Sequence, residues 1–312
     1  MSGMMSGIPR IELAGLTRRL PSGGKILTIL DGIDLRIGAG EFVAILGPSG
    51  SGKSTMLALM AGLDRPSSGR VLLDGEPIQE LSEDALALLR RRKVGFVFQS
   101  FQLLGNLTAR ENILLPMELI GRRDARDRAA ALLGEVGLSE RGHHYPSQLS
   151  GGEQQRVAVA RAFAAEPSIL LADEPTGNLD SATGRSLLDA LARMRDRHGT
   201  TLVLVTHDPA VAATAERLVY LRDGRIEREE KGAARGAGAG TGGPEKAGAG
   251  PGAGAGGGGA PATVERAGRP AVAPGERSAE AAPAIEGTAA AFEGAAARTV
   301  HGTKSSGGAD KP

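Results

Sequence analysis

Eight residues near the start of the chain have the types and the spacing of a phosphate-binding loop. They fit the pattern G-x-x-x-x-G-K-[ST] at every defined position, as Gly47-Pro-Ser-Gly-Ser-Gly52-Lys53-Ser54. Small residues let successive backbone N–H groups curl around phosphate oxygens, and a helix that begins after Gly52 would point its positive end at the same anion. In such a loop Lys53 reaches the β- and γ-phosphates, and the Ser54 hydroxyl is a ligand of Mg²⁺. The residues expected to contact the nucleotide here are Gly47, Pro48, Ser49, Gly50, Ser51, Gly52, Lys53, Ser54 and Thr55.

A pair of carboxylates further along the chain supplies the second part of a phosphate-hydrolysing site. The apolar run Ile169-Leu-Leu-Ala ends directly in Asp173 and Glu174. In open α/β folds ligands bind at the carboxyl ends of buried strands, so this pair is expected at the ligand edge of a sheet. We expect Asp173 to hold Mg²⁺, directly or through water, and Glu174 to orient or deprotonate the attacking water. The chain has no Asn-Lys-x-Asp sequence to read guanine, which favours ATP over GTP.

The elements that must position these groups follow an α/β pattern. The continuous apolar run 42–46 before the loop is typical of a strand buried on both faces, and the helix formers 53–61 follow it. Two more apolar runs, 169–172 and 202–205, flank a predicted helix over 182–197. Strands that alternate with helices predict a parallel sheet with helices on both faces.

Other segments differ from this pattern. Short strands are expected at 11–13, 33–37, 71–73 and 94–98. From about residue 100 to 165 the pattern is helical, with capping-box spacing at Thr108 and Glu111 and helices expected over 126–136 and 153–165. We interpret this stretch as a helical lobe inserted into the same domain.

A third motif offers a second anion site in a chain that has only one phosphate loop. Ser150, Gly151 and Gly152 precede a helix expected to begin near Glu153, and they offer a hydroxyl and exposed N–H groups at its positive end. A lone Ser-Gly-Gly is more often an ordinary helix cap. Here it belongs to a longer motif, Leu149-Ser150-Gly151-Gly152-Glu153-Gln154-Gln155-Arg156.

This motif resembles the signature of ATP-binding-cassette (ABC) ATPases, and the resemblance runs over residues ~10–228. It implies a P-loop NTPase fold with a parallel-sheet core, an antiparallel β subdomain and an inserted helical lobe. Gln99 matches the family's Q-loop glutamine, which has catalytic and Mg²⁺-binding roles. Asp180 of Asn178-Leu-Asp matches the D-loop, and His207 matches the catalytic switch histidine.

The resemblance also implies a head-to-tail dimer. The phosphate loop of one copy and residues 149–153 of the other would enclose one ATP, so half of each site is missing until two chains meet. The residues of the second half that are expected to contact the nucleotide are Ser150, Gly151, Gly152, Glu153 and Asp180.

Three stretches, 95–101, 106–112 and 172–180, resemble the lipoprotein-release and macrolide-export (LolD/MacB/YbbA) type, which pairs such a subunit with an FtsX-like membrane permease. The alternative is a non-transporting ABC ATPase that regulates cell-envelope or cell-division machinery through its permease. A soluble ABC ATPase of DNA repair or translation is disfavoured, because the chain has no heptad arms, no cysteine zinc module and no second cassette. One departure from the family is Leu20, which aligns where many members stack adenine on an aromatic ring.

Composition sets the limits of the folded part. Residues 231–312 contain no Leu, Met, Tyr or Trp. Their large apolar residues are Val264, Val272, Ile285, Phe292 and Val300, too few to offset an ordering cost of ~1–2 kcal/mol per residue. We therefore expect one ABC ATPase domain over 8–230 and a disordered Gly/Ala/Pro-rich tail over 231–312.

Charge and targeting signals limit the partners. The net charge of +1 gives no basic field to recruit nucleic acid, and the absence of cysteine rules out disulfides and Cys-ligated metals. No apolar run approaches the ~20 residues of a membrane helix, and the first residues do not form a secretory signal. The expectation is a cytoplasmic protein that is peripheral on the inner face of the membrane through its permease.

Overall fold

The computed structural model describes residues 7–232, which all lie in the first of the chain's two units, residues 1–235 and 236–312. The tail expected at 231–312 lies outside the described residues, except for its first two positions.

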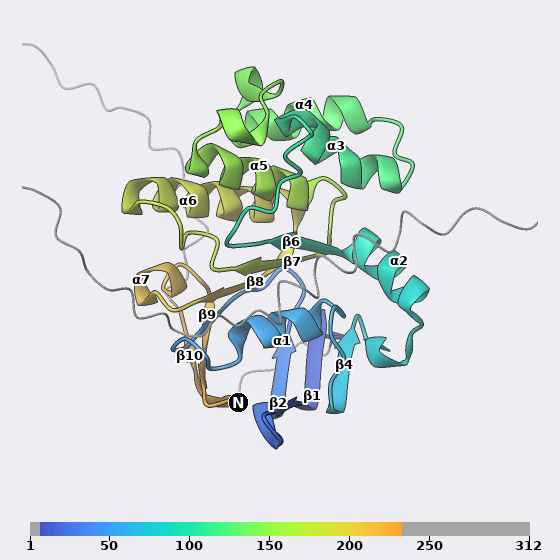
Figure 1. Ribbon diagram of the computed structural model, residues 1–312, viewed down its shortest axis with the longest axis vertical. Coiled ribbons are helices and arrows are strands. Elements are labelled where there is room, and N and C mark those ends of the chain that lie inside the picture. The colour runs from blue at the N-terminus through green and yellow to red at the C-terminus, as the bar shows by residue number, and fades with distance from the viewer. Residues whose placement is uncertain (1–6, 233–312) are drawn as a thin grey trace, which may run out of the picture. The chain divides into compact units, whose positions relative to one another are not determined.

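A six-stranded sheet in the order β10-β9-β3-β8-β7-β6 forms the centre of the described part (Figure 1). Its strands are β3 (Phe42–Leu46), β6 (Val94–Val97), β7 (Ile169–Asp173), β8 (Thr201–Thr206), β9 (Arg217–Arg222) and β10 (Arg225–Lys231). Neighbouring strands from β6 to β9 are parallel, and β10 returns antiparallel to β9. Asp223 and Gly224 both have positive φ in this return, as a two-residue hairpin turn of type I′ requires. The parallel-sheet core that the sequence predicts is confirmed.

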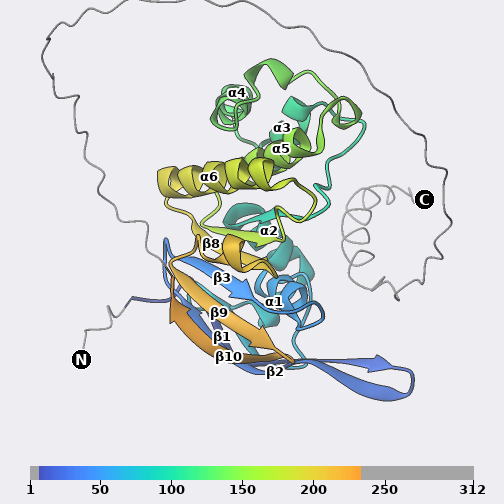
Figure 2. The ribbon, with the colours of Figure 1, turned by 90° about the vertical axis from the view of Figure 1, so that its left-hand side faces the viewer.

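A second, antiparallel sheet in the order β2-β1-β4-β5 lies below the first in Figure 1. It comprises β1 (Ile11–Ser22), β2 (Lys25–Ile37), β4 (Ser68–Leu73) and the short β5 (Glu76–Pro77). β1 and β2 are much longer than the expected strands 11–13 and 33–37, and their paired ends project from the domain as a hairpin (Figure 2). Residues 20–28 of this hairpin are exposed, so they lack the alternating apolar pattern of a half-buried strand.

Helices cover both faces of the central sheet. They are α1 (Lys53–Met60), α2 (Glu83–Lys93), α3 (Ala109–Leu119), α4 (Ala125–Glu135), α5 (Gly151–Phe163), α6 (Ser181–His198) and α7 (Pro209–Ala212). α1 lies between the two sheets, whereas α3 to α6 lie on the opposite face of the central sheet (Figures 1 and 2). The expected lobe between about 100 and 165 is the group α3, α4 and α5. The helix α2 was not predicted, and α5 begins at Gly151 rather than near Glu153.

The central strands contribute alternate residues to two separate cores. Phe42, Ala44 and Leu46 of β3 pack into the core beneath α3 to α6. Val43 and Ile45 of the same strand pack into the core around α1. This two-sided burial accounts for the continuous apolar run, since neither face of the strand meets water. Within residues 7–232, no helix combines the length and apolarity needed to cross a membrane.

Candidate nucleotide-binding site

The phosphate loop connects the carboxyl end of β3 to the first turn of α1. Gly52 is the N-cap of α1 with φ 99°, a conformation that an L side chain rarely adopts. A Cβ on Gly52 would lie 2.8 Å from the carbonyl oxygen of Ile29, and a Cβ on Gly47 would collide with the carbonyl of Leu221. The glycines of the motif are therefore needed for backbone shape and for close approach of neighbouring strands.

The ammonium group of Lys53 is held inside its own loop. Its Nζ donates hydrogen bonds of 2.9 Å to the carbonyl oxygens of Gly47 and Pro48, and the residue is only 6% exposed. Burial lowers the pKa of Lys53, and the negative charges of Glu174 and Asp173 oppose this shift. A cation in the first turn of a helix, beside a glycine-rich loop, is suited to bind a polyphosphate.

Two of the expected magnesium ligands lie together. The Ser54 hydroxyl donates a 3.2 Å hydrogen bond to Oδ1 of Asp173, so the loop and the end of β7 meet. Burial raises the pKa of Asp173, helped by the charge of Glu174, while the hydrogen bond from Ser54 and the charge of Lys53 oppose the rise. One hydroxyl and one carboxylate fit Mg²⁺, which is commonly held by one or two carboxylates together with phosphates and water. The described residues contain no cluster of three or more acidic, His or Cys side chains that could hold an ion without a phosphate.

The side chains of Glu174 and His207 form a close pair. Nδ1 of His207 lies 2.6 Å from Oε2 of Glu174. They come from the ends of β7 and β8, which are adjacent parallel strands. Glu174 has φ 43°, and its backbone N–H donates to the carbonyl of Val205. A non-glycine residue in this backbone region is uncommon, and such strain gathers at functional sites.

The loop that follows Glu174 contacts Gln99, the third residue expected to be catalytic. The side-chain amide nitrogen of Gln99 would lie 2.9 Å from a Cβ added to Gly177. Its backbone carbonyl oxygen accepts a 3.0 Å hydrogen bond from Nδ2 of Asn178. The structure thus brings Gln99 beside the segment that carries the carboxylates.

The second anion motif caps α5. The Ser150 hydroxyl accepts from the backbone N–H of Glu153, and Oε2 of Glu153 accepts from the backbone N–H (2.8 Å) and the hydroxyl (2.9 Å) of Ser150. A Cβ on Gly151 would lie 3.6 Å from the ring of Phe101, and one on Gly152 would lie 2.5 Å from Cγ2 of Thr183. The motif belongs to the helices on the opposite face of the central sheet from α1. One chain therefore does not bring its two anion motifs to the same layer.

Asp180 has a local role as the N-cap of α6. Its Oδ1 accepts hydrogen bonds from the backbone N–H groups of Ala182 (3.1 Å) and Thr183 (3.0 Å). Hydrogen bonds with Thr183, with a further one from Ala182, lower the pKa of Asp180.

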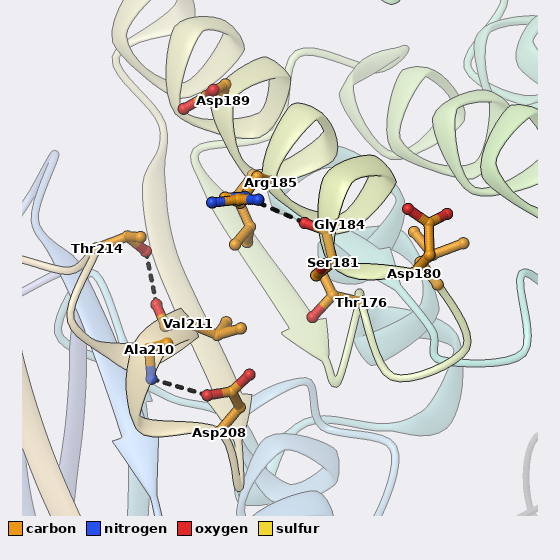
Figure 3. A pocket seen from close by; sticks show the side chains of 12 residues that line it. Thr176, Asp180, Ser181, Gly184, Arg185, Asp189, Asp208, Ala210, Val211 and Thr214 are labelled. Atoms are coloured by element: carbon orange, nitrogen blue, oxygen red, sulfur yellow. Dashed lines mark hydrogen bonds between the residues drawn. The ribbon is translucent and has the colours of Figure 1, made fainter.

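A cavity of about 700 Å³ adjoins Asp180 between α6 and α7 (Figure 3). Thr176, Arg185 and Asp208 line it, and Asp208 also caps α7 through the backbone N–H of Ala210. None of the phosphate-loop residues lines this cavity, but Asp180, which is expected in the second half of the composite site, does.

Two polar residues of α5 that turn inward, the buried Gln155 and the half-buried Arg161, were not predicted from the sequence. The amide of Gln155, fully buried, donates to the carbonyls of Phe98 (3.2 Å) and Pro175 (2.8 Å). Arg161 donates to the carbonyls of Phe101 (3.0 Å) and Gln102 (2.6 Å). Burial lowers the pKa of Arg161 to about 10. Both side chains tie the helix of the second anion motif to the loop after β6, and a helical pattern alone does not show which polar residue turns inward.

Leu20 lies on the exposed part of the β1–β2 hairpin. It pairs with Leu27, and its side chain is 37% exposed. Ile29, two residues after Leu27, borders Gly52 of the phosphate loop. The hairpin therefore carries Leu20 outward from the edge of this loop.

Comparison with known proteins identifies the class of protein. The ABC transporter family matches residues 30–177. The uncharacterized ABC transporter ATP-binding protein YbbA of Escherichia coli K12 is 50% identical over 221 residues, which cover 70% of this chain and 97% of YbbA. The chain belongs to the ABC transporter ATP-binding family, and it is an ATPase of that class.

Particular relatives refine this placement. The macrolide export ATP-binding/permease protein MacB of Syntrophobacter fumaroxidans is 48% identical over 223 residues, but the match covers 70% of this chain and only 31% of MacB. Among solved structures, the cassette MJ0796 of Methanocaldococcus jannaschii, a dimer in a post-hydrolysis state bound to ADP and Pi, is 46% identical with a TM-score of 0.67. That match covers 71% of this chain and 98% of MJ0796. The chain thus spans almost the whole of the separate ATP-binding relatives and about a third of MacB. The predicted resemblance to the LolD/MacB/YbbA type and the ABC ATPase fold are both confirmed.

Proposed function

We propose that this chain hydrolyses ATP as a head-to-tail dimer that encloses two ATP molecules and drives an FtsX-like membrane permease. The observation that carries the proposal is the separation of the two anion motifs. The phosphate loop belongs to the α1 side of the central sheet, and Ser150 caps a helix on its other side. A second copy supplies the missing half of each site, in keeping with the dimeric structures of the relative MJ0796.

The proposed roles of the residues follow their contacts. Lys53 and the loop from Gly47 to Thr55 would hold the β- and γ-phosphates, and Ser54, Asp173 and Gln99 would hold Mg²⁺. When bound, the metal would neutralise part of the negative charge on the transferred phosphoryl group. Glu174 accepts the proton of the attacking water, and His207, 2.6 Å away, fixes the orientation of that carboxylate.

The permease is proposed to bind next to the loop that carries Gln99, on the surface of α2 and α3. Large apolar side chains are exposed there, namely Leu88 on α2 and Leu119 and Ile120 at the end of α3. A hydrogen bond from Arg91 to the carbonyl of Leu119 joins the two helices. Exposed apolar groups that belong to one surface are suited to a protein partner. Such a partner would hold the chain peripherally on the inner face of the membrane.

The dimer can be tested by cross-linking, because the chain contains no cysteine. Ser49→Cys and Ser150→Cys, each on a Glu174→Gln background, would place one thiol in each half of the composite site. A short bis-maleimide should join the two variants only when they are mixed in the presence of ATP and Mg²⁺. Equal cross-linking of Ser150→Cys with itself would contradict the head-to-tail arrangement.

The permease surface has a separate test. Leu119→Asp with Ile120→Asp should abolish co-purification with the native membrane partner while the ATPase rate of the isolated chain is unchanged. Ile26→Asp, at a more exposed apolar residue on the hairpin, is the control. Retention of the permease by the double variant would contradict this surface.

A further inference from the structure

The second anion motif itself contains a negative charge. Glu153 is in the first turn of α5, and its Oε2 accepts two hydrogen bonds from Ser150, at 2.8 Å and 2.9 Å. These hydrogen bonds hold the pKa of Glu153 below its usual range, so the carboxylate is ionised at neutral pH. In the proposed dimer the same Ser150 faces a phosphate of the partner's ATP. An ionised carboxylate there repels the nucleotide unless its charge is balanced.

Arg141 provides that balance from a different segment of the helical lobe. Its Nε lies 3.4 Å from Oε1 of Glu153, the oxygen that the Ser150 hydrogen bonds leave free. Its Nη1 lies 3.3 Å from Nε2 of His144, which fixes the far side of the guanidinium. The backbone carbonyl of His144 in turn accepts a 2.8 Å hydrogen bond from Ala109 at the start of α3. Arg141 is thus held by the lobe with its charge directed at Glu153.

Arg156 is the other cation near this carboxylate, and its charge also lowers the pKa of Glu153, after that of Arg141. It is on the same helix as Glu153, whereas Arg141 comes from the turn of residues 139–141. Arg141 is also the partner within ion-pair distance of Glu153. It is therefore the cation whose removal leaves one carboxylate oxygen without its ion-pair partner.

We propose that Arg141 is a positioning residue of the second anion motif, which neutralises Glu153 and holds it in the cap so that Ser150 and the N–H groups of α5 can accept the partner's phosphate. The inference rests on the proposed head-to-tail dimer. Arg141 lies outside the signature motif, and the inference is that its charge allows this motif to bind an anion. The charge of Glu153 can be tested separately from its role in the helix cap, because Glu153→Gln keeps the acceptor oxygen and loses the charge.

The experiment measures the ATP-dependent monomer–dimer equilibrium on a Glu174→Gln background, by light scattering, together with ATP affinity of the dilute monomer. Arg141→Gln should weaken dimerisation about tenfold, because an unbalanced like charge then faces the nucleotide, and it should leave the monomer's ATP affinity unchanged. The weakening should shrink as salt is raised, since the repulsion is screened. Arg126→Gln, an exposed arginine of α4 in the same lobe, is the control and should dimerise as the parent does.

A second pair of variants distinguishes charge from structure. Introduced into Glu153→Gln, the change Arg141→Gln should alter dimerisation less than twofold, because there is no longer a charge to balance. An equal loss in both backgrounds, without salt dependence, would show that Arg141 merely supports the lobe and would overturn the inference. No loss with Arg141→Gln in the original background would overturn it as well. Failure of the parent itself to dimerise with ATP would instead overturn the proposed function, and the inference with it.

Discussion

His207 Nδ1 and Glu174 Oε2 lie 2.6 Å apart at the ends of two adjacent parallel strands. Such a contact fixes one carboxylate oxygen of Glu174 and leaves the other for a reacting group. The left-handed backbone at Glu174 turns the side chain away from the direction that the strand would give it. Each of the two residues directly follows its strand, so the pairing of β7 with β8 brings them together.

Glu174→Gln should lower the ATPase rate on the order of 10²- to 10⁴-fold, the usual contribution of a general base, because an amide cannot accept the proton of water. Nucleotide binding should persist, and ATP should then hold the dimer closed. Steady-state phosphate release and ATP-dependent size exclusion measure the two effects. Glu80→Gln, at an exposed carboxylate outside the site, is the control. Hydrolysis at the parent rate would remove Glu174 from this role.

Lys53→Ala should weaken ATP binding on the order of 10- to 100-fold, since charge-assisted hydrogen bonds to phosphate are lost. Calorimetric titration with ATP measures this change, and the exposed Lys25→Ala is the matched control. The loss should be smaller for adenosine, which has no phosphate for the ammonium to bind. An equal loss for adenosine and ATP would point to a general distortion of the loop.

Leu20→Tyr should tighten ATP binding a few-fold, because aromatic stacking on the base contributes ~1 kcal/mol. The exposed position of Leu20 on the hairpin leaves room for a larger ring. GTP should gain as well, whereas inorganic triphosphate should gain nothing. If neither Leu20→Tyr nor Leu20→Ala changes the affinity for ATP, residue 20 does not contact the base.

Truncation after Gly232 should leave the ATPase rate unchanged and shift the melting temperature by less than about 2 °C, which corresponds to under ~1 kcal/mol for a domain of this size. The cut is best made there because β10 extends to Lys231 and the backbone N–H of Gly232 donates to the carbonyl of Glu216. Differential scanning calorimetry of the two chains measures the shift. A loss of many degrees would contradict the prediction of a dispensable tail.

The sequence is most informative where a motif adjoins a buried strand. The phosphate loop and the Asp173–Glu174 pair follow continuous apolar runs, so both the strands and the placement of the motifs could be predicted. The helix α2 was missed because its apolar residues form one continuous run, 85–89, which shows no helical period. Of this run only Leu86 and Leu89 are buried. Its capping residue Ser82 and basic last turn were the available signals.

The contacts between α5 and the loop after β6 were beyond sequence reasoning for a different reason. Gln155 and Arg161 appear in the sequence as ordinary polar positions of an amphipathic helix. Their partners are backbone carbonyls, which every residue has, so no residue type marks the other end of the contact. Only the folded arrangement of the lobe against the sheet reveals them.

The two hydrogen bonds that Lys53 makes to Gly47 and Pro48 bear on the speed of nucleotide capture. These hydrogen bonds join the end of the loop to its start, so the loop is already ordered before any ligand arrives. Arriving phosphate oxygens need only replace the two carbonyls as hydrogen-bond acceptors of the Lys53 ammonium. Little binding free energy is therefore lost in ordering the chain. Capture of ATP by such a preorganised loop should be limited by encounter with the nucleotide rather than by folding of the site.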